Sequence, residues 1–245
     1  LFKMAAPILK IFDTDKTVAQ NLCSFVIDRA NSCINSHGIF AVGVSGGSLA
    51  KFLCQGLPSL ETDWSKWRLF FCDERHVAFD DPDSTYKVYK EGLMSKVPLA
   101  ENHVFKTNPN VSVEDAAKEY ITKVRSVLPG DELPRFDMLL LGMGPDGHTC
   151  SLFPGHPLLK ETEQIVAPIC DSPKPPPQRI TLTLPVVNNT RCAVFASCGA
   201  GKAEMVKRVL EGSEEPPLPA SQVRPSNGEL YWFLDQPAAS LLSKK

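Results

Sequence analysis

The sequence predicts an α/β fold with a mostly parallel sheet covered by helices on both faces. Three observations predict it. Short apolar runs alternate with longer stretches of helical periodicity, glycine-rich turns follow two of the runs, and the alternation resumes after the one proline-rich segment. An apolar run such as Met138–Leu141 is typical of a strand buried on both faces. We expect a single α/β domain over residues 1–245, because no internal repeat or low-complexity tract divides the chain.

Local signals place the elements along the chain. Asp15, Ser84 and Ser112 are expected to cap helices, and His37-Gly38 is expected to end the first one. The expected helices cover residues 16–36, 49–57, a stretch from 84, a stretch ending near 128, 201–210 and a last helix after 234. The expected strands cover residues 39–44, 67–72, 136–141, 180–184, 192–197 and 230–234. Residues 73–83 and the proline-rich residues 172–178 are expected to be loops.

Composition excludes several classes of protein. A chain of 245 residues with 43% hydrophobic and 22% charged residues is long and apolar enough to bury a sizeable core. A net charge of −2 gives no overall basic field, which argues against nucleic acid as the main partner. No apolar run approaches the roughly 20 residues of a membrane span. A small anionic substrate needs only a local cationic pocket, so that class remains open.

The cysteines and the first residues bear on location. None of the eight cysteines lies in a C-x-x-C pair, and several lie in apolar segments, where a thiol behaves as a small hydrophobic group. We therefore expect free thiols, a cytosolic location and no zinc site. Residues 1–10 lack the apolar core of a signal peptide. Because Leu1 is not an initiator, we expect the natural start at Met4.

The most informative stretch covers residues 142–154, directly after an apolar strand. Its three glycines allow a tight bend and the close approach of a ligand at the carboxyl edge of the sheet. Asp146 and His148 stand two residues apart in this turn. A lone histidine is usually structural, but an imidazole in such a turn can take a proton from water near neutral pH. We expect Cys150 to pack in the core, because neighbours in one turn rarely reach the geometry of a Cys–His nucleophile.

A second turn, Ser45-Gly46-Gly47-Ser48, follows a strand and opens a helix. Backbone amides and the positive helix end suit a phosphate monoester, although the Lys-Ser/Thr ending of a P-loop is missing. The same stretch fits a nucleophile elbow, with Ser45 as the attacking oxygen. It also fits a plain turn capped by Ser48. Phosphate binding is favoured over the elbow because only one obvious strand precedes the turn and its paired glycines permit close approach of an anion.

Charged residues follow other predicted strands. Asp73 and Arg75 come directly after the apolar strand predicted at residues 67–72. Arg75 could bind a phosphate or stabilise an oxyanion. Asp73 could hold a sugar hydroxyl or orient Arg75. The alternative is a surface ion cluster. Arg179 enters an alternating strand, where an anion ligand and an edge charge are equally plausible. Lys202 near the start of a helix is electrostatically misplaced unless it faces an anion.

Together these segments resemble the glucosamine-6-phosphate isomerase/6-phosphogluconolactonase family, and within it the lactonase branch. The resemblance is carried by residues 44–48, 72–75, 142–154, 179–183 and 201–203. It implies a Rossmann-like three-layer αβα fold and hydrolysis of 6-phospho-D-glucono-1,5-lactone to 6-phospho-D-gluconate, a step of the oxidative pentose phosphate pathway. It implies no metal and no organic cofactor. The expected partner is a small phosphorylated sugar lactone, with neither nucleic acid nor membrane, and we expect a monomer.

The resemblance also implies roles for the site residues. His148 is the implied base that activates water, and Arg75 and Asp73 are expected to face the lactone. Two points are our own inference: that Asp146 holds the imidazole ring, and that Arg75 serves the carbonyl while Arg179 serves the phosphate. The implied substrate-binding residues, placed about the phosphate, are Ser45, Gly46, Gly47, Ser48, Arg179 and Lys202.

Two departures separate this chain from the deaminase branch of the family. That branch has a glutamate five residues beyond the histidine, where this chain has Phe153, and tends to have tyrosine where this chain has Arg75. Both departures favour the lactonase. A sugar-phosphate sensor without catalysis is a further alternative, against which the intact Asp146 and His148 argue.

Overall fold

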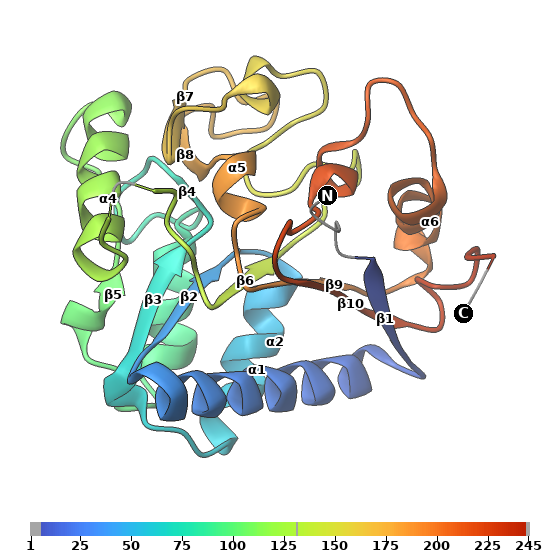
Figure 1. Ribbon diagram of the computed structural model, residues 1–245, viewed down its shortest axis with the longest axis horizontal. Coiled ribbons are helices and arrows are strands. Elements are labelled where there is room, and N and C mark those ends of the chain that lie inside the picture. Colours follow the sequence, from blue (N-terminus) through green and yellow to red (C-terminus); the bar gives the residue numbers. More distant parts are fainter. Residues whose placement is uncertain (1–5, 131, 244–245) are drawn as a thin grey trace.

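A parallel sheet forms the centre of the molecule (Figure 1). The computed structural model describes residues 6–130 and 132–243, so the expected start at Met4 lies outside the described residues. The strand order is β1-β10-β9-β6-β2-β3-β5, and every neighbouring pair is parallel. The strands are β1 Pro7–Phe12, β2 Phe40–Val44, β3 Trp67–Phe71, β5 Val104–Phe105, β6 Met138–Leu141, β9 Cys192–Ser197 and β10 Glu229–Asp235.

Helices cover both faces of this sheet, as predicted (Figure 1). Successive strand residues point to opposite faces. In β6, Met138 and Leu140 therefore pack with the core under α1 and α2, whereas Leu139 and Leu141 pack with the core that includes α4 and α6. The helices are α1 Asp15–His37, α2 Ser48–Gly56, α3 Thr85–Tyr89, α4 Val113–Val127, α5 Leu184–Val187 and α6 Ala203–Glu211. The two apolar clusters hold in place the carboxyl ends of β2 and β6, where the turns at residues 45–48 and 142–148 begin.

A second, antiparallel sheet lies beside the first and was not predicted. Its strand order is β4-β8-β7, with β4 Asp73–Arg75, β8 Arg179–Leu182 and β7 Val166–Ile169. The prediction of a loop over residues 73–83 is therefore wrong at its start. The strand predicted at 180–184 exists but belongs to this smaller sheet. β8 is buried along its whole length, and its apolar pattern did not reveal which strand would pair with it.

Side-chain caps define where α1, α3 and α4 begin. The Oγ1 atom of Thr14 accepts a hydrogen bond from the amide three residues on and caps α1, so the predicted cap, Asp15, is instead the first helical residue. Gly38 ends α1 with a φ of 89°, as predicted. Ser84 and Ser112 cap α3 and α4 as predicted, each accepting from the amide three residues later.

The expected last helix is wrong for the described residues. Residues 236–241 form turns instead, and no helix follows in residues 242–243. The Asp235 carboxylate accepts hydrogen bonds from the Gly199 and Ala238 amides, and the Gln236 amide donates to the Phe12 carbonyl. These bonds tie the segment to β1 and to the loop after β9, and they compete with a helical ladder.

Two further observations concern the chain as a whole. All eight cysteines are free, which confirms the prediction of free thiols. Among the described residues, no helix is both long and apolar enough to cross a membrane.

The strand order reverses beside β2, since β3 lies on one side of it and β6 on the other. In open α/β sheets, ligands bind outside the carboxyl ends of the strands at such a switch point.

Candidate active site

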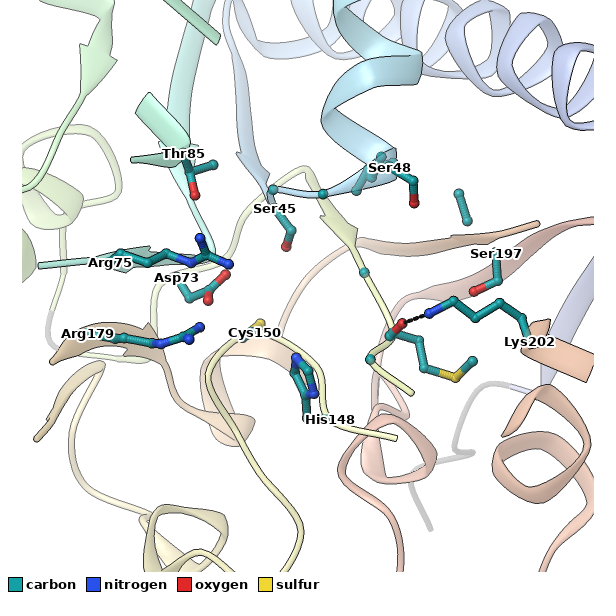
Figure 2. Close-up of a pocket in the computed structure, with 17 residues that line it drawn as sticks. Ser45, Ser48, Asp73, Arg75, Thr85, His148, Cys150, Arg179, Ser197 and Lys202 are labelled. Atoms are coloured by element: carbon teal, nitrogen blue, oxygen red, sulfur yellow. Dashed lines mark hydrogen bonds between the residues drawn. The ribbon is translucent and has the colours of Figure 1, made fainter. Parts of the chain in front are cut away.

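A pocket of about 210 Å³ opens at this switch point (Figure 2). The turns after β2, β6 and β9 form one wall, because these neighbouring parallel strands end at the same edge. The small sheet forms another wall with β4 and β8. The lining residues are Ser45, Gly46, Gly47, Ser48, Leu49, Asp73, Arg75, Thr85, Gly142, Met143, Gly144, His148, Cys150, Arg179, Ala196, Ser197 and Lys202.

The pocket brings together nearly all of the residues predicted from the sequence. The two turns predicted to bind phosphate and to supply the base, residues 45–48 and 142–148, face the same cavity. Asp73, Arg75, Arg179 and Lys202 also line it. Asp146 is the exception among the predicted residues, because it contacts His148 without lining the cavity. The roles assigned to these residues remain predictions.

The imidazole of His148 is held by one nitrogen. Its Nδ1 lies 2.5 Å from Asp146 Oδ1, and its side chain is 18% exposed. Because a carboxylate only accepts, the neutral ring carries its proton on Nδ1, and Nε2 is left as an acceptor. Burial lowers the pKa of His148 below its ordinary value, although Asp146 opposes the shift. Burial raises the pKa of Asp146, but the hydrogen bond and charge of His148 outweigh it and lower the value to about 2.

Packing fixes the plane of the same imidazole. Gly144 passes so close that a Cβ there would lie 2.0 Å from the His148 Cε1 and Nδ1 atoms. The Gly144 amide donates to the His148 carbonyl at 2.9 Å and closes the turn. The Phe153 ring also lies close, 4.7 Å from the imidazole, centroid to centroid. Only glycine at 144 leaves room for the ring in this position.

Cys150 follows in the same turn and is buried. Its hydrogen bond with the Cys72 thiol, together with burial, raises the pKa of Cys150 well above the ordinary value. A thiol in this state is a poor nucleophile, because the thiolate is the reactive form. The observation supports the expectation that Cys150 packs in the core.

The start of α2 offers backbone donors to the pocket. Gly47 precedes the helix with a φ of 73°, and no side chain caps it. Ser48 is thus the first helical residue rather than the cap. The first amides of a helix lack internal partners and carry positive potential, so they suit an anion. The buried Ser45 Oγ lines the same pocket and hydrogen-bonds to no described residue.

This state of Ser45 bears on the nucleophile elbow. An elbow serine needs a base within hydrogen-bond reach. No described residue bonds Ser45 Oγ, and the Tyr89 hydroxyl holds the Ser45 carbonyl at 2.9 Å. The geometry therefore favours the anion-binding interpretation of this turn.

Arg75 and Arg179 lie directly opposite each other on β4 and β8. Arg179 is only 3% exposed and donates from Nε and Nη2 to three carbonyls of residues 174–176, so its second terminal nitrogen, Nη1, keeps its donors free of described partners. Arg75 donates to the Asp83 carbonyl at 2.9 Å. The buried Asp73 carboxylate accepts from the Ser151 hydroxyl at 2.7 Å. Two guanidinium groups thus share one end of the pocket.

Lys202 lies at the other end. Figure 2 shows its ammonium on the far side of His148 from the two arginines. Its Nζ donates to the Met143 carbonyl at 2.8 Å. Burial, with a smaller contribution from Lys174, lowers the pKa of Lys202. A half-buried ammonium with one neutral partner retains donors for an anion.

Sequence reasoning missed Ser197, Thr85 and Lys174. Ser197 ends β9 at the pocket, and its buried Oγ has no described partner, so the strand-end rule could have found it. Thr85 enters the pocket because a turn of α3 packs on Gly46. Lys174 contacts Asp146 and His148 from the proline-rich loop. No sequence signal pointed to it, because its position depends on the unpredicted pairing of β7 with β8.

One group of possible metal ligands occurs among residues 6–130 and 132–243. Cys33 Sγ, His37 Nε2 and an Asp137 oxygen lie within 4.8 Å of one another. They lie near the amino ends of β2 and β6, at the edge opposite the pocket. Asp137 Oδ1 is already 3.0 Å from His37 Nε2 and 3.4 Å from Arg191 Nε. A cation would have to displace the Arg191 charge from this oxygen.

Comparison with known proteins identifies the family. Residues 13–232 match the model for glucosamine-6-phosphate isomerases/6-phosphogluconolactonase. The 6-phosphogluconolactonase of Homo sapiens is 49% identical over 98% of this chain and 96% of its own length. The solved 6-phosphogluconolactonase of Trypanosoma brucei is 25% identical, with a TM-score of 0.84 over 99% of this chain and 100% of that one. A monomeric glucosamine-6-phosphate deaminase, at 21% identity over 95% of this chain and 99% of that one, shares the fold with a TM-score of 0.79. The chain therefore belongs to the glucosamine-6-phosphate isomerase/6-phosphogluconolactonase family.

Proposed function

We propose that this protein hydrolyses 6-phospho-D-glucono-1,5-lactone to 6-phospho-D-gluconate, the step of the oxidative pentose phosphate pathway that opens the lactone. One observation carries the proposal. The imidazole of His148, with Nε2 unpartnered among the described residues, lines the same pocket as the uncapped start of α2. A base and an anion site in one cavity suit a phosphorylated substrate with an electrophilic carbon. The names of the full-length relatives agree with this reaction.

The reaction begins at His148. Nε2 takes a proton from a water molecule, and the resulting hydroxide attacks the C1 carbonyl of the lactone. Arg75 stabilises the negative oxygen of the tetrahedral intermediate. The intermediate collapses by breaking the bond from C1 to the ring oxygen, and His148 returns the proton to the departing C5 oxygen. General-base help typically gives about 10²- to 10⁴-fold, and one oxyanion donor about 10²- to 10³-fold.

The phosphate fixes C1 beside the base. We assign it to the first amides of α2 and the hydroxyls of Ser45 and Ser48, with Lys202 supplying positive charge. Arg179 was expected from the sequence to bind the phosphate, but it lies beside Arg75 at the opposite end of the pocket from Lys202 (Figure 2), so we place it near the lactone ring. Arg75 and Asp73 then face the lactone ring. Holding the far end of a substrate converts binding energy into correct placement of the reacting carbon. A δ-lactone is a reactive ester, so this modest set of groups is sufficient.

The environment of His148 favours a lactonase over a deaminase. The deaminase branch of the family uses a glutamate five residues beyond the histidine to form a relay. Phe153 stands at that position, and its ring packs on the imidazole. An apolar ring cannot relay a proton. Release of ammonia from glucosamine 6-phosphate would contradict the proposal and favour the deaminase.

The decisive test measures proton release on adding fresh 6-phosphogluconolactone, with the uncatalysed rate subtracted. We expect catalysis by the unaltered protein and a loss of about 10²- to 10⁴-fold in kcat for His148→Ala. His156→Ala is a matched control, because His156 also pairs with a carboxylate, Asp171, but lies outside the pocket. His148→Ala should still bind 6-phosphogluconate. Near-normal turnover by His148→Ala would show that His148 is not the base. An absence of turnover by the unaltered protein would favour the alternative of a sugar-phosphate sensor without catalysis.

A further inference from the structure

The loop between β7 and β8 brings a lysine to the back of the catalytic imidazole. Lys174 Nζ lies 3.1 Å from Asp146 Oδ1 and 3.2 Å from His148 Nδ1. The lysine does not line the pocket where His148 Nε2 is expected to meet substrate. It therefore contacts the Asp146–His148 pair from the side away from the reaction.

This contact is built into the fold. The nearly buried Arg179 holds the loop by donating to the carbonyls of Lys174, Pro175 and Pro176 at 3.0 to 3.1 Å. The Ser172 hydroxyl also donates to the Lys174 carbonyl at 2.8 Å. Proline fixes φ, so the segment after Lys174 has few alternative conformations. The backbone of Lys174 is thus anchored on both sides, which limits the conformational entropy lost when its side chain reaches the pair.

The charge at this position has a specific consequence. Asp146 by itself would favour the imidazolium, since an opposite charge at hydrogen-bond distance stabilises the protonated ring. An ammonium 3.2 Å from Nδ1 disfavours the positive charge of the imidazolium and partly neutralises Asp146, so it opposes the addition of a second proton at Nε2. Because Lys174 can donate to Asp146 Oδ1 alongside Nδ1, it also fixes the carboxylate that orients the ring.

We propose that Lys174 is a positioning residue for the lactonase reaction, which keeps the Asp146–His148 pair in the form with a neutral imidazole and with Nε2 free to act as base. The effect on rate rests on the proposed function of His148. The effect on the protonation of His148 does not.

Other charges also face the imidazole and are present in every variant. Asp73 on β4 favours the imidazolium, as Asp146 does. The remaining charged residues of the pocket are Arg75, Arg179 and Lys202. Lys174 is distinguished from these three by its direct contact with Nδ1.

The test measures the pKa of His148 by NMR of the ring signals, the His148 signal being identified by its loss in His148→Ala. In Lys174→Met we expect this pKa to rise by about 0.5 to 1 pH unit, the scale of one partly exposed charge at this distance. In the pH profile of kcat/KM for the lactone, the midpoint of the fall at acidic pH (the acid limb) should rise by the same number of pH units. Lys174→Arg keeps the charge and should keep the lower pKa. Lys118→Met is the matched control, because Lys118 pairs with Asp115 at 3.0 Å on the exposed face of α4.

The outcomes separate the two proposals. An unchanged His148 pKa in Lys174→Met overturns the role of Lys174, and so does an effect on KM alone, which would make the lysine a substrate ligand. If the pKa of His148 rises while the acid limb stays in place, the lysine acts as inferred and His148 is not the base. If Lys174→Met is poorly folded, Lys174→Arg compared with Lys174→Gln in the same NMR titration decides the question.

Discussion

The behaviour of His148 is set by its neighbours. Asp146 holds Nδ1, Phe153 packs on one face of the ring, and Gly144 lies against it so closely that no side chain fits. Lys174 completes the surroundings from behind. The sequence indicated Asp146, which stands two residues before His148 in the same turn, but it did not indicate that Phe153 and Gly144 would pack on the ring. It could not reveal Lys174, which arrives from another element.

Gly144→Ala should reduce catalysis while leaving the fold intact. The new Cβ would lie 2.0 Å from two imidazole atoms, so the ring must move. A displacement of about 1 Å in a catalytic group can cost about 10²-fold, and we expect a loss of this size in kcat with little change in KM. Gly201→Ala is the control, since a Cβ there meets nothing within 4 Å. Steady-state kinetics at saturating lactone make the comparison, and an unchanged kcat in Gly144→Ala would show that ring placement is not critical.

The pH dependence of the unaltered protein follows from the same surroundings. The folded environment lowers the pKa of His148 below its ordinary value of 6.5. The base works in its neutral form, which predominates above the folded pKa, so kcat/KM should fall only as the pH drops below 6.5. Asp146 keeps its charge across this range, because its pKa is about 2. A pH–rate profile corrected for spontaneous hydrolysis measures this fall in kcat/KM at acidic pH. A midpoint above pH 6.5 would contradict the assignment of His148 as the base.

At the scale of elements, prediction succeeded where a local pattern was strong. The predicted strand at 192–197 matches β9 in full, and the predicted cap Ser112 begins α4. Four strands were missed, one of them β4, which lies where a loop was predicted. β1 alternates between half-buried and exposed residues at the edge of the sheet, β5 has two residues, and β7 contains Pro168, a residue that sequence patterns count against a strand. The partner of β8 was also beyond prediction, because pairing between distant segments is decided by tertiary packing.

A single buried carboxylate joins β4 to α3. Glu74 is 4% exposed and accepts hydrogen bonds from the amides of Arg75, Thr85 and Tyr86 at 2.8 to 2.9 Å. Glu74→Gln would place an amide nitrogen against one of these donors. We expect the free energy of unfolding to fall by about 1 to 3 kcal/mol, the cost of a buried donor left unsatisfied. Urea denaturation compares Glu74→Gln with the control Glu91→Gln, which changes an exposed residue. Equal stability of the two variants would contradict the role of Glu74 in joining β4 to α3.

At the scale of the whole molecule, the pocket lies where the two sheets meet. The central parallel sheet supplies the turns at 45–48 and 142–148, and the segment after β9 supplies Lys202. The small sheet supplies Asp73, Arg75 and Arg179. The rule that ligands bind at the carboxyl ends of parallel strands predicted the first contribution. It could not predict that an antiparallel sheet would bring two arginines to the same cavity.

A phosphorylated ligand that touches both sheets should therefore stabilise the whole fold. A ligand that binds only the native state adds about 2.7 kcal/mol of stability at a concentration of 100 Kd, which raises Tm by about 2–4 °C per kcal/mol for a chain of this size. We expect 6-phospho-D-gluconate to raise Tm and D-gluconate at the same concentration to have little effect, because the start of α2 and Lys202 recognise the phosphate. Lys202→Ala should shrink the shift by raising Kd, whereas Lys207→Ala, exposed on α6, should retain it. Equal shifts from the two ligands, or a full shift in Lys202→Ala, would show that the phosphate is held elsewhere.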